Sequence, residues 1–133
     1  MEAFSDVLER SVEAEQASLQ ALVSDQREQV ALVAKIDGVL AGVCLLVRSE
    51  LEPCHPVSPW LAGLYVAPEH RCRGVGRALV RAIEYQARQR GHRRVHLYTD
   101  GAVPYYERLG WSTIDRIEWK GTPTVLMARE LQP

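Results

Sequence analysis

The spacing of apolar residues predicts one amphipathic helix in the second half of the chain. Val75, Leu79, Ile83 and Ala87 recur every four residues, with arginines and a glutamate elsewhere on the helix. Gly91 is a natural end for this helix, because glycine readily adopts the left-handed conformation that often follows a helix C-terminus. Arginines in the last turn also suit the negative end of the helix dipole.

Six short apolar runs have the length and composition of β-strands. They are residues 29–35, 39–48, 60–66, 94–99, 111–119 and 124–129. Asp37-Gly38 separates the first two runs and is a strong hairpin signal. Lys120-Gly121 lies between the last two runs, which are therefore predicted to close the chain as a second hairpin.

The remaining segments are predicted as two helices and a loop. Residues 1 to about 26 carry apolar positions at helical intervals, with glutamate and glutamine between them. Residues 102–109 are expected to form a short helix, which tolerates Pro104 in its first turn. Residues 50–59 contain three prolines and are expected to be a loop. The order of elements indicates an α/β (α+β) fold with a mixed, mostly antiparallel sheet.

Composition narrows the class of protein. A chain of 133 residues with 47% apolar and 25% charged residues fits a single domain over residues 1–133 with a proper core. A net charge of −1 gives no sign of a nucleic-acid partner, and no apolar run is long enough to span a membrane. The N-terminus is acidic and polar, unlike a secretory signal. Three widely spaced cysteines favour reduced thiols, a cytoplasmic location and no metal site.

A glycine-rich turn precedes the amphipathic helix and has the chemistry of an anion site. Gly74 and Gly76 lack Cβ atoms, so a ligand can approach the backbone closely. The free amides of the first helical turn point toward the same place, which the helix dipole makes electropositive. Arg71, Arg73 and Arg77 add full charges. A phosphate or pyrophosphate is the expected ligand, and a purely structural turn with solvated arginines is the alternative.

The turn matches neither of two common phosphate-binding motifs. A dinucleotide-binding G-x-G-x-x-G would need glycine in place of Leu79, and the P-loop pattern is absent. Instead, Arg71-x-x-Gly74-x-Gly76 resembles the [QR]-x-x-G-x-[GA] acyl-CoA signature of the GNAT superfamily of acyl-CoA-dependent N-acyltransferases.

A second segment supports this resemblance. Residues 105–111, with the sequence YYERLGW, are similar to the F-Y-x-x-L-G-[FW] segment of the same family. The resemblance covers roughly residues 30 to 131 and implies a single GNAT-like domain. In such a domain the strands at 60–66 and 94–99 run parallel at the centre of the sheet and splay apart. The family's first strand is expected to be missing or supplied otherwise, because almost no sequence precedes the helix predicted at the N-terminus.

The resemblance implies acetyl-CoA as the acyl donor. Its pantetheine arm would pair with backbone groups of Leu64 to Val66, and its pyrophosphate would lie on the amides of Arg71 to Ala78. The same backbone groups could stabilise the oxyanion that forms when an amine attacks the thioester. The expected cofactor-binding residues are Leu64, Tyr65, Val66, Arg71, Cys72, Arg73, Gly74, Val75, Gly76, Arg77 and Ala78.

Tyr106 is the catalytic candidate that the resemblance implies. It corresponds to the family's tyrosine that faces the cofactor sulfur, whereas Tyr105 is expected to pack. A phenol has a pKa of about 10, above the value of about 8.5 for a thiol, so it can protonate the departing thiolate. The alternative is that Tyr106 is only a core aromatic. Thr99-Asp100-Gly101 replaces an asparagine that many family members place near the end of the preceding strand.

The acceptor and the general base are less defined by the sequence. An amine is protonated at neutral pH and must lose a proton before it attacks. The candidates for the base are Glu50, Glu52, His55, His96 and Asp100, with relayed water as a further option. Glu50, Glu52 and Asp100 are also expected to bind the substrate, and acidic groups there favour a small, positively charged primary amine.

The sequence therefore predicts an N-acetyltransferase that moves an acetyl group from acetyl-CoA to a primary amine by direct attack. The acceptor could be a small molecule or a peptide amine. A non-catalytic acyl-CoA-binding or sensor module is the alternative, since little sequence precedes the predicted first helix. Dimerisation is common in the family, and a homodimer is left open.

Overall fold

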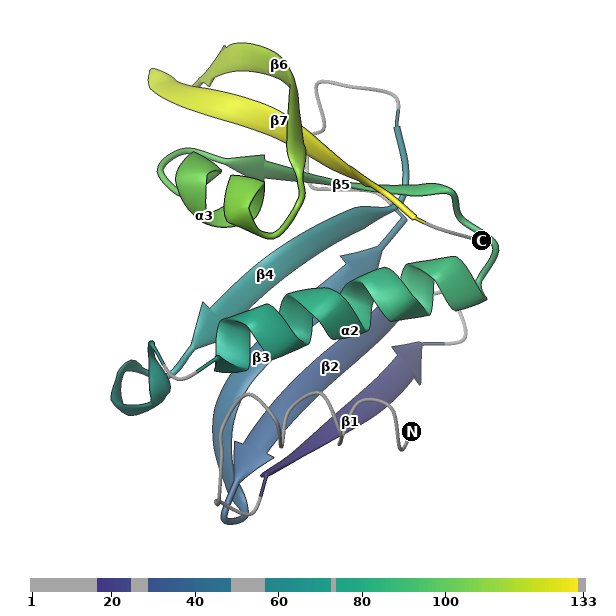
Figure 1. Cartoon of the computed structure of the whole chain (residues 1–133), viewed down its shortest axis with the longest axis vertical. Helices are drawn as coiled ribbons and strands as arrows, with labels where there is room; N and C mark the ends of the chain where they lie inside the picture. Colours follow the sequence, from purple (N-terminus) through teal and green to yellow (C-terminus); the bar gives the residue numbers. More distant parts are fainter. Residues whose placement is uncertain (1–16, 25–28, 49–56, 73, 132–133) are drawn as a thin grey trace.

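Seven strands pair into one mixed β-sheet in a computed structural model of the protein, which describes residues 17–24, 29–48, 57–72 and 74–131. The strands are β1 (Ala17–Ser24), β2 (Gln29–Ile36), β3 (Val39–Val47), β4 (Trp60–Val66), β5 (Arg94–Thr99), β6 (Ser112–Trp119) and β7 (Thr122–Glu130). Their order across the sheet is β1-β2-β3-β4-β5-β7-β6 (Figure 1). The pair β4–β5 is parallel and all other pairs are antiparallel, which confirms the predicted mixed sheet.

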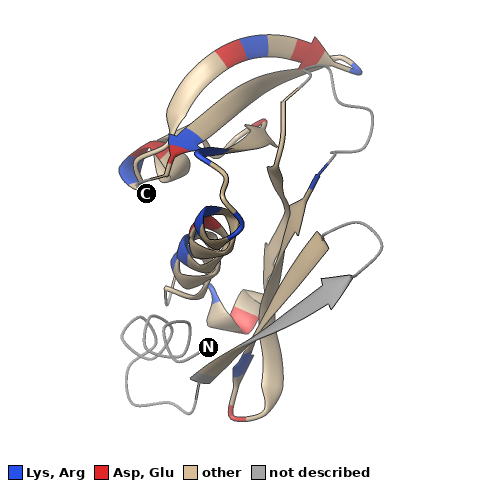
Figure 2. Cartoon of the chain, turned by 90° about the vertical axis from the view of Figure 1, so that its right-hand side faces the viewer, with Lys and Arg blue, Asp and Glu red and all other residues tan. Residues whose placement is uncertain are grey.

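Helix α2 (Val75–Gln89) lies across one face of the sheet, over β2, β3 and β4 (Figures 1 and 2). Its apolar stripe is fully buried against that face, as the four-residue spacing predicts. Helix α3 (Val103–Arg108) follows β5 and joins the same core, and a 3₁₀ turn, η1 (Pro68–His70), links β4 to the glycine turn. Among the described residues, no helix has both the length and the apolar character needed to cross a bilayer.

The helix predicted over residues 1 to about 26 is wrong where the structure describes that region. Residues 17–24 form β1, which pairs with β2 at the edge of the sheet, so a strand is present at the position where one was expected to be missing. Leu19, Ala21 and Val23 alternate in sequence and pair with Ala34, Leu32 and Val30 of β2, which are buried. The same apolar residues fit both a helical and an alternating spacing, and pairing with the exposed edge of β2 selects the strand.

The parallel pair at the centre of the sheet separates soon after it begins. Trp60 of β4 pairs with His96 of β5, and the amide of His96 donates to the carbonyl of Pro59 over 3.0 Å. Among the described residues, no further β4–β5 pair follows, and the two strands diverge toward Val66 and Thr99 (Figure 1). The predicted splayed pair is therefore confirmed, and it opens the sheet at the carboxyl ends of both strands.

A β-bulge in β4 lies at the point where the strands separate. Cys44 of β3 faces two residues, Gly63 and Leu64, because the register shifts by one between Val43 and Leu45. Gly63 has a φ of 62°, a left-handed conformation that side-chain-bearing residues seldom adopt. A bulge bends its strand and increases its twist, so it helps to turn the end of β4 away from β5.

Candidate functional site

A cavity of about 390 Å³ lies where the end of β4 meets the start of helix α2. It brings together most of the residues predicted to bind the acyl donor, together with a tyrosine that was expected only to pack. The lining residues are Leu64, Tyr65, Val66, Arg71, Cys72, Gly74, Gly76, Arg77 and Tyr105. This set, called the cleft below, combines apolar strand residues with a glycine turn and two arginines.

The glycine turn leaves backbone amides free at the mouth of the cleft. Cys72 and Gly74 both have a positive φ, of 62° and 85°, so the chain turns sharply before the helix begins. The first helical hydrogen bond runs from the amide of Ala78 to the carbonyl of Gly74 over 3.0 Å. The amides of the preceding helical residues therefore have no acceptor within the helix, and they form the positive end of its dipole.

The two arginines of the cleft are held in different ways. Arg71 donates a hydrogen bond from Nε to the carbonyl of Val66 over 2.9 Å, and its guanidinium lies 5.6 Å from the ring centre of Tyr65. Arg77 is exposed, and within the described part of the chain it has no acidic partner. Arg71 is thus already fixed in the turn, while Arg77 has its full charge available for an anion.

Gly76 is required by the close approach of two elements. A Cβ at this position would lie 3.0 Å from the hydroxyl oxygen of Tyr105 and 3.5 Å from Cγ2 of Val66. Any larger side chain would fill the space between α2, β4 and α3. The glycine therefore keeps the cleft open as well as exposing its amide.

The two adjacent tyrosines of α3 have different surroundings. Tyr105 is half-buried and lines the cleft, whereas Tyr106 is only 8% exposed and packs in the core. The rings meet edge to face, with centres 5.2 Å apart, and Tyr106 also contacts Trp111 at 5.9 Å. Neighbouring residues of a helix point about 100° apart, so Tyr105 lines the cleft while Tyr106 lies in the core next to Tyr105. Sequence alone offered no basis for assigning Tyr105 to the cleft.

Burial keeps both phenols protonated. It raises the pKa of Tyr106 to about 12, with smaller contributions from the nearby Cys44 and Tyr105. It also raises the pKa of Tyr105, against the opposing effect of the charges on Arg77 and Arg81. Both hydroxyls are therefore proton donors at neutral pH, with Tyr106 in the more apolar environment.

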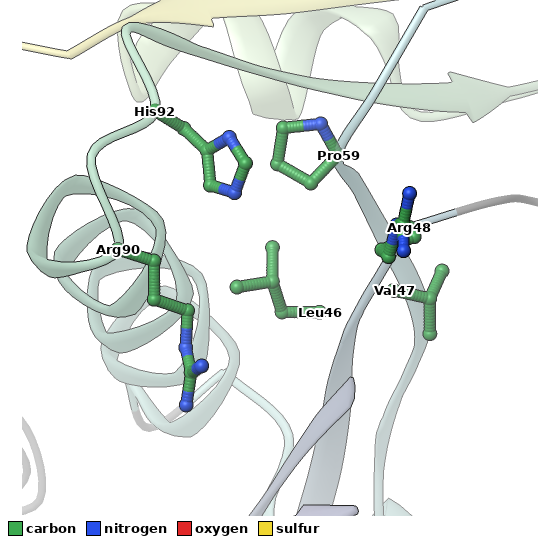
Figure 3. Close-up of a pocket in the computed structure, with 6 residues that line it drawn as sticks. All are labelled: Leu46, Val47, Arg48, Pro59, Arg90 and His92. Atoms are coloured by element: carbon green, nitrogen blue, oxygen red, sulfur yellow. The ribbon is translucent and has the colours of Figure 1, made fainter. Parts of the chain in front are cut away.

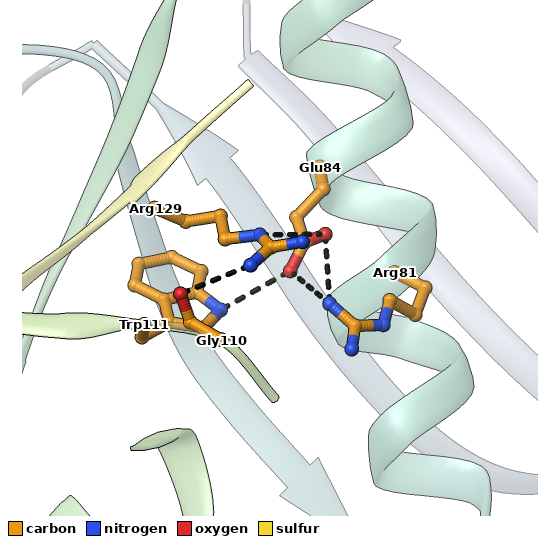
Figure 4. Close-up of polar contacts among 5 residues, drawn as sticks. All are labelled: Arg81, Glu84, Gly110, Trp111 and Arg129. Atoms are coloured by element: carbon orange, nitrogen blue, oxygen red, sulfur yellow. Dashed lines mark hydrogen bonds and ion pairs between the residues drawn. The ribbon is translucent and has the colours of Figure 1, made fainter. Parts of the chain in front are cut away.

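A polar cluster fastens the segment after α3 to helix α2 (Figure 4). Glu84 of α2 accepts hydrogen bonds from Arg81 over 3.0 Å and from Nε1 of Trp111 over 3.1 Å. Arg129 of β7 lies 3.7 Å from the same carboxylate and donates to the carbonyl of Gly110 over 3.0 Å. The carboxylate thus connects α2, the end of α3 and β7, and fixes the position of the tyrosine-bearing helix beside the glycine turn.

The opposite face of the parallel pair carries aromatic residues. Trp60 is fully buried, and its ring centre lies 4.6 Å from Tyr98 and 5.7 Å from His96. Nδ1 of His96 lies 3.2 Å from the carbonyl of Pro59, which can only accept, so Nδ1 carries the proton and Nε2 the lone pair. Burial lowers the pKa of His96, and the bond to Pro59 partly offsets this effect. His96 is therefore neutral at pH 7.

The remaining predicted site residues lie in three kinds of place. Val75 and Ala78 are buried in the core, so they can offer only backbone groups to a ligand. Asp100 is exposed just beyond the end of β5, at the open end of the parallel pair. Four others, Glu50, Glu52, His55 and Arg73, lie outside the described residues.

The family comparison agrees with this geometry. A family described as "Acetyltransferase (GNAT) family" matches residues 1–111. The chain belongs to the GNAT acetyltransferase family. The predicted relationship is thus confirmed over more than the two motifs that indicated it.

Individual proteins similar to this chain share a modest part of its sequence. An uncharacterized N-acetyltransferase of Azospirillum brasilense is 37% identical over 73 residues, which cover 53% of this chain and 42% of that protein. The chain therefore matches less than half the length of that relative. The fold is similar to an aminoglycoside 6'-N-acetyltransferase complexed with coenzyme A, with a TM-score of 0.68, 19% identity, and coverage of 80% of this chain and 74% of the other. It is also similar to nourseothricin acetyltransferase, with a TM-score of 0.68, 21% identity and 92% coverage of both chains.

Proposed function

We propose that this GNAT protein transfers an acetyl group from acetyl-CoA to a primary amine by direct attack. The observation that carries the proposal is the cleft itself, where a glycine turn at a helix N-terminus meets the opening between β4 and β5. A long ligand with an anionic head and a thin polar arm fits that combination. Coenzyme A is bound in a solved acetyltransferase of the same fold, which supports the choice of donor.

Two parts of the cleft would bind two parts of the proposed donor. The free amides from Gly74 to Arg77 would hold the pyrophosphate, helped by the helix dipole and by the charge of Arg77. The exposed edge of β4 beyond the bulge would pair with the pantetheine arm, as an added strand does. Ala78 would offer its amide less readily to the donor, because that amide donates to the carbonyl of Gly74.

The chemistry that we propose for the chain uses the end of β4 and the helix α3. The thioester supplies the acyl carbon and a thiolate leaving group. Amides of β4 from Leu64 to Val66 would stabilise the oxyanion as the amine nitrogen bonds to the acyl carbon. Tyr106 would give its phenolic proton to the sulfur as the carbon–sulfur bond breaks, and its burial favours this neutral, proton-carrying form. The nitrogen would lose its second proton to solvent as the amide forms, and solvent would reprotonate the phenolate.

The acceptor is proposed to be a small, positively charged primary amine. Asp100 supports this class, because it is an exposed carboxylate at the open end of the parallel pair. The amine must lose a proton before it attacks, and neutral His96 on β5 is the described residue whose ionisation state best suits that step. His96 lies at the closed end of the pair, so a water molecule would have to carry the proton to Nε2.

The experiment that tests this function measures release of the free thiol from acetyl-CoA with a panel of amines. Polyamines, aminoglycosides, amino acids and peptides with a free N-terminus or lysine would cover the acceptor classes. Saturable turnover with a cationic amine is the expected result, with kcat/KM rising with pH as the amine is deprotonated. Binding of acetyl-CoA without turnover of any amine would instead indicate a non-catalytic acyl-CoA-binding module.

A further inference from the structure

A second cavity lies at the other end of helix α2, far from the cleft. Its volume is about 330 Å³, and Figure 3 shows the side chains that surround it. The lining residues are Leu46, Val47, Arg48, Pro59, Arg90 and His92. We call this set the basic pocket. It takes no part in the proposed acetyl transfer.

The three basic side chains of the pocket come from two parts of the chain. Arg48 directly follows β3, Arg90 is the C-terminal cap of α2, and His92 lies in the connection to β5. In Figure 3, Arg48 and Arg90 lie on opposite sides of the opening, and the ring of His92 points into it from above. The fold thus gathers cationic groups that are more than forty positions apart in the sequence.

Among the described residues, some arginines pair with an acidic side chain and others do not. Arg94 pairs with Glu130, and Arg81 and Arg129 share Glu84. Within the described ranges of the chain, Arg48 and Arg90 have no acidic partner. Two like charges beside one cavity repel each other, and a bound anion would convert that repulsion into attraction.

The rest of the pocket has an apolar part made by two residues. Leu46 is 2% exposed and Pro59 is buried beside it, whereas the side chain of Val47 packs with Trp60 on the other face of the sheet. The ring of Pro59 faces the ring of His92 across the opening (Figure 3). A ligand that suits this surface therefore needs an apolar body as well as a negative group.

Because the C-terminal end of α2 borders the pocket, an anion can be attracted there only by side chains. The C-terminus of a helix presents carbonyl oxygens and the negative end of the dipole, so the backbone offers an anion nothing here. Helix α2 has 15 residues, which at 1.5 Å per residue separates the pocket from the cleft by about 22 Å. The pocket is therefore too far away to be an extension of the cleft that holds the pyrophosphate.

We propose that the basic pocket binds a small organic carboxylate. A guanidinium group presents paired donors that match the two oxygens of a carboxylate, and Arg48 and Arg90 can supply them from both sides. The apolar floor favours an acid with a short aliphatic or aromatic body over an inorganic anion. A volume of about 330 Å³ is at the lower end of small-molecule sites, which limits the ligand to a compact one.

Sodium benzoate is a suitable probe, because it combines a carboxylate with a compact ring. It would be titrated into the whole chain while the methyl signals of Leu46 and the ring signals of His92 are followed by NMR. We expect saturable shifts with a Kd of about 1 mM or tighter, which weaken as salt is added. Benzamide, which has the same shape without the charge, should leave these signals unchanged.

Substitutions of single arginines distinguish specific binding in the pocket from nonspecific attraction of benzoate to a positively charged surface. Arg48→Gln and Arg90→Gln should each weaken benzoate binding by about tenfold or more, because each removes a charged hydrogen-bond donor. Arg93→Gln is the matched control: it removes the same charge from an exposed residue one position after His92 that does not line the pocket. It should change the Kd by less than about twofold.

Three results would overturn the proposal. One is the absence of saturable shifts at Leu46 and His92 up to about 10 mM benzoate. Another is benzamide binding as tightly as benzoate. The third is a loss in Arg93→Gln equal to that in Arg90→Gln, which would show attraction by the overall charge of this end of the molecule. Acetyl-CoA affinity should stay the same in all three variants, so the outcome is independent of the proposed acetyl transfer.

Discussion

The two ends of helix α2 carry similar residues but offer an anion different chemistry. Arginines and a glycine with positive φ lie at both ends: Arg71, Gly74 and Arg77 around the start of the helix, and Arg90 and Gly91 just after it. At the first end the backbone adds free amides and a positive dipole. At the second end it adds carbonyl oxygens and a negative dipole, so only side chains can attract an anion.

This difference shows that composition alone does not define an anion site. The first end, joined to the opening between β4 and β5, suits a long ligand with a diphosphate. The second end is bordered by Leu46 of β3 and by Pro59, and it suits a compact acid. The direction of the backbone and the neighbouring strands decide which ligand each set of arginines can hold.

The largest expected effect is the loss of CoA binding when a negative charge is added at the N-terminal end of α2, compared with the same charge added at the C-terminal end. Gly76→Glu places bulk and charge among the free amides, beside the hydroxyl of Tyr105. We expect calorimetry to show no detectable binding of CoA, a loss of about 100-fold or more. Gln89→Glu is the matched control, because it adds the same charge at an exposed position in the last turn. Equal CoA affinity in wild type and Gly76→Glu would reject the placement of the pyrophosphate.

A second difference is chemical, since the phenols of Tyr105 and Tyr106 lie at the cleft end. Tyr106→Phe keeps the ring and removes the proton donor, so kcat should fall by about 100-fold with little change in KM for acetyl-CoA. Tyr105→Phe makes the same change on the neighbouring residue, which lines the cleft, and should affect kcat by only a few-fold, about the value of one hydrogen bond. The reverse ranking would identify Tyr105 as the acid and Tyr106 as a packing residue.

The polar cluster around Glu84, which holds α3 against α2, should contribute more to the free energy of unfolding than an exposed ion pair does. Glu84→Gln weakens its contacts with Arg81 and Arg129, and we expect the free energy of unfolding to fall by about 1–3 kcal/mol. Glu130→Gln is the control, because Glu130 and its partner Arg94 are at least half exposed and such pairs contribute about 0–1 kcal/mol. Urea titration of both variants measures the difference. Equal losses would show that the cluster has no special role.

The smallest expected effect concerns alkaline pH. A phenol with a pKa of 10 would be half ionised at pH 10, and kcat would drop by about twofold there. Because burial raises the pKa of Tyr106 to about 12, it keeps its proton, and kcat should stay level between about pH 8 and pH 10. A fall to half over this range, at saturating substrate and with the fold intact, would contradict the role of a buried Tyr106 as the acid.

Most of the fold could be predicted because its signals are local. The spacing of Val75, Leu79 and Ile83 marks α2, and Asp37-Gly38 marks the β2–β3 hairpin. The segment that contains β1 could not be assigned correctly, because its apolar residues fit both spacings and the edge of β2 selects the strand. The bulge at Gly63 was also missed, since it arises from the register between two strands.

The candidate site was predictable where a motif lies in one stretch of sequence. The glycine turn is such a stretch, and its residues do meet the end of β4 in the cleft. The orientation of Tyr105 and Tyr106 was not predictable, because adjacent helical residues differ only in the direction they face. The basic pocket was missed for another reason: Arg48 and Arg90 meet only through the packing of β3 against α2.

Binding of acetyl-CoA at the N-terminal end of α2 can be measured by titrating ¹⁵N-labelled protein with acetyl-CoA and following the glycine amides at both ends of the helix. We expect the amide signals of Gly74 and Gly76 to shift with a Kd of about 1 μM to 1 mM, while the signal of Gly91 does not change. Unchanged amides at Gly74 and Gly76, or an equal shift at Gly91, would contradict binding at this end of the helix.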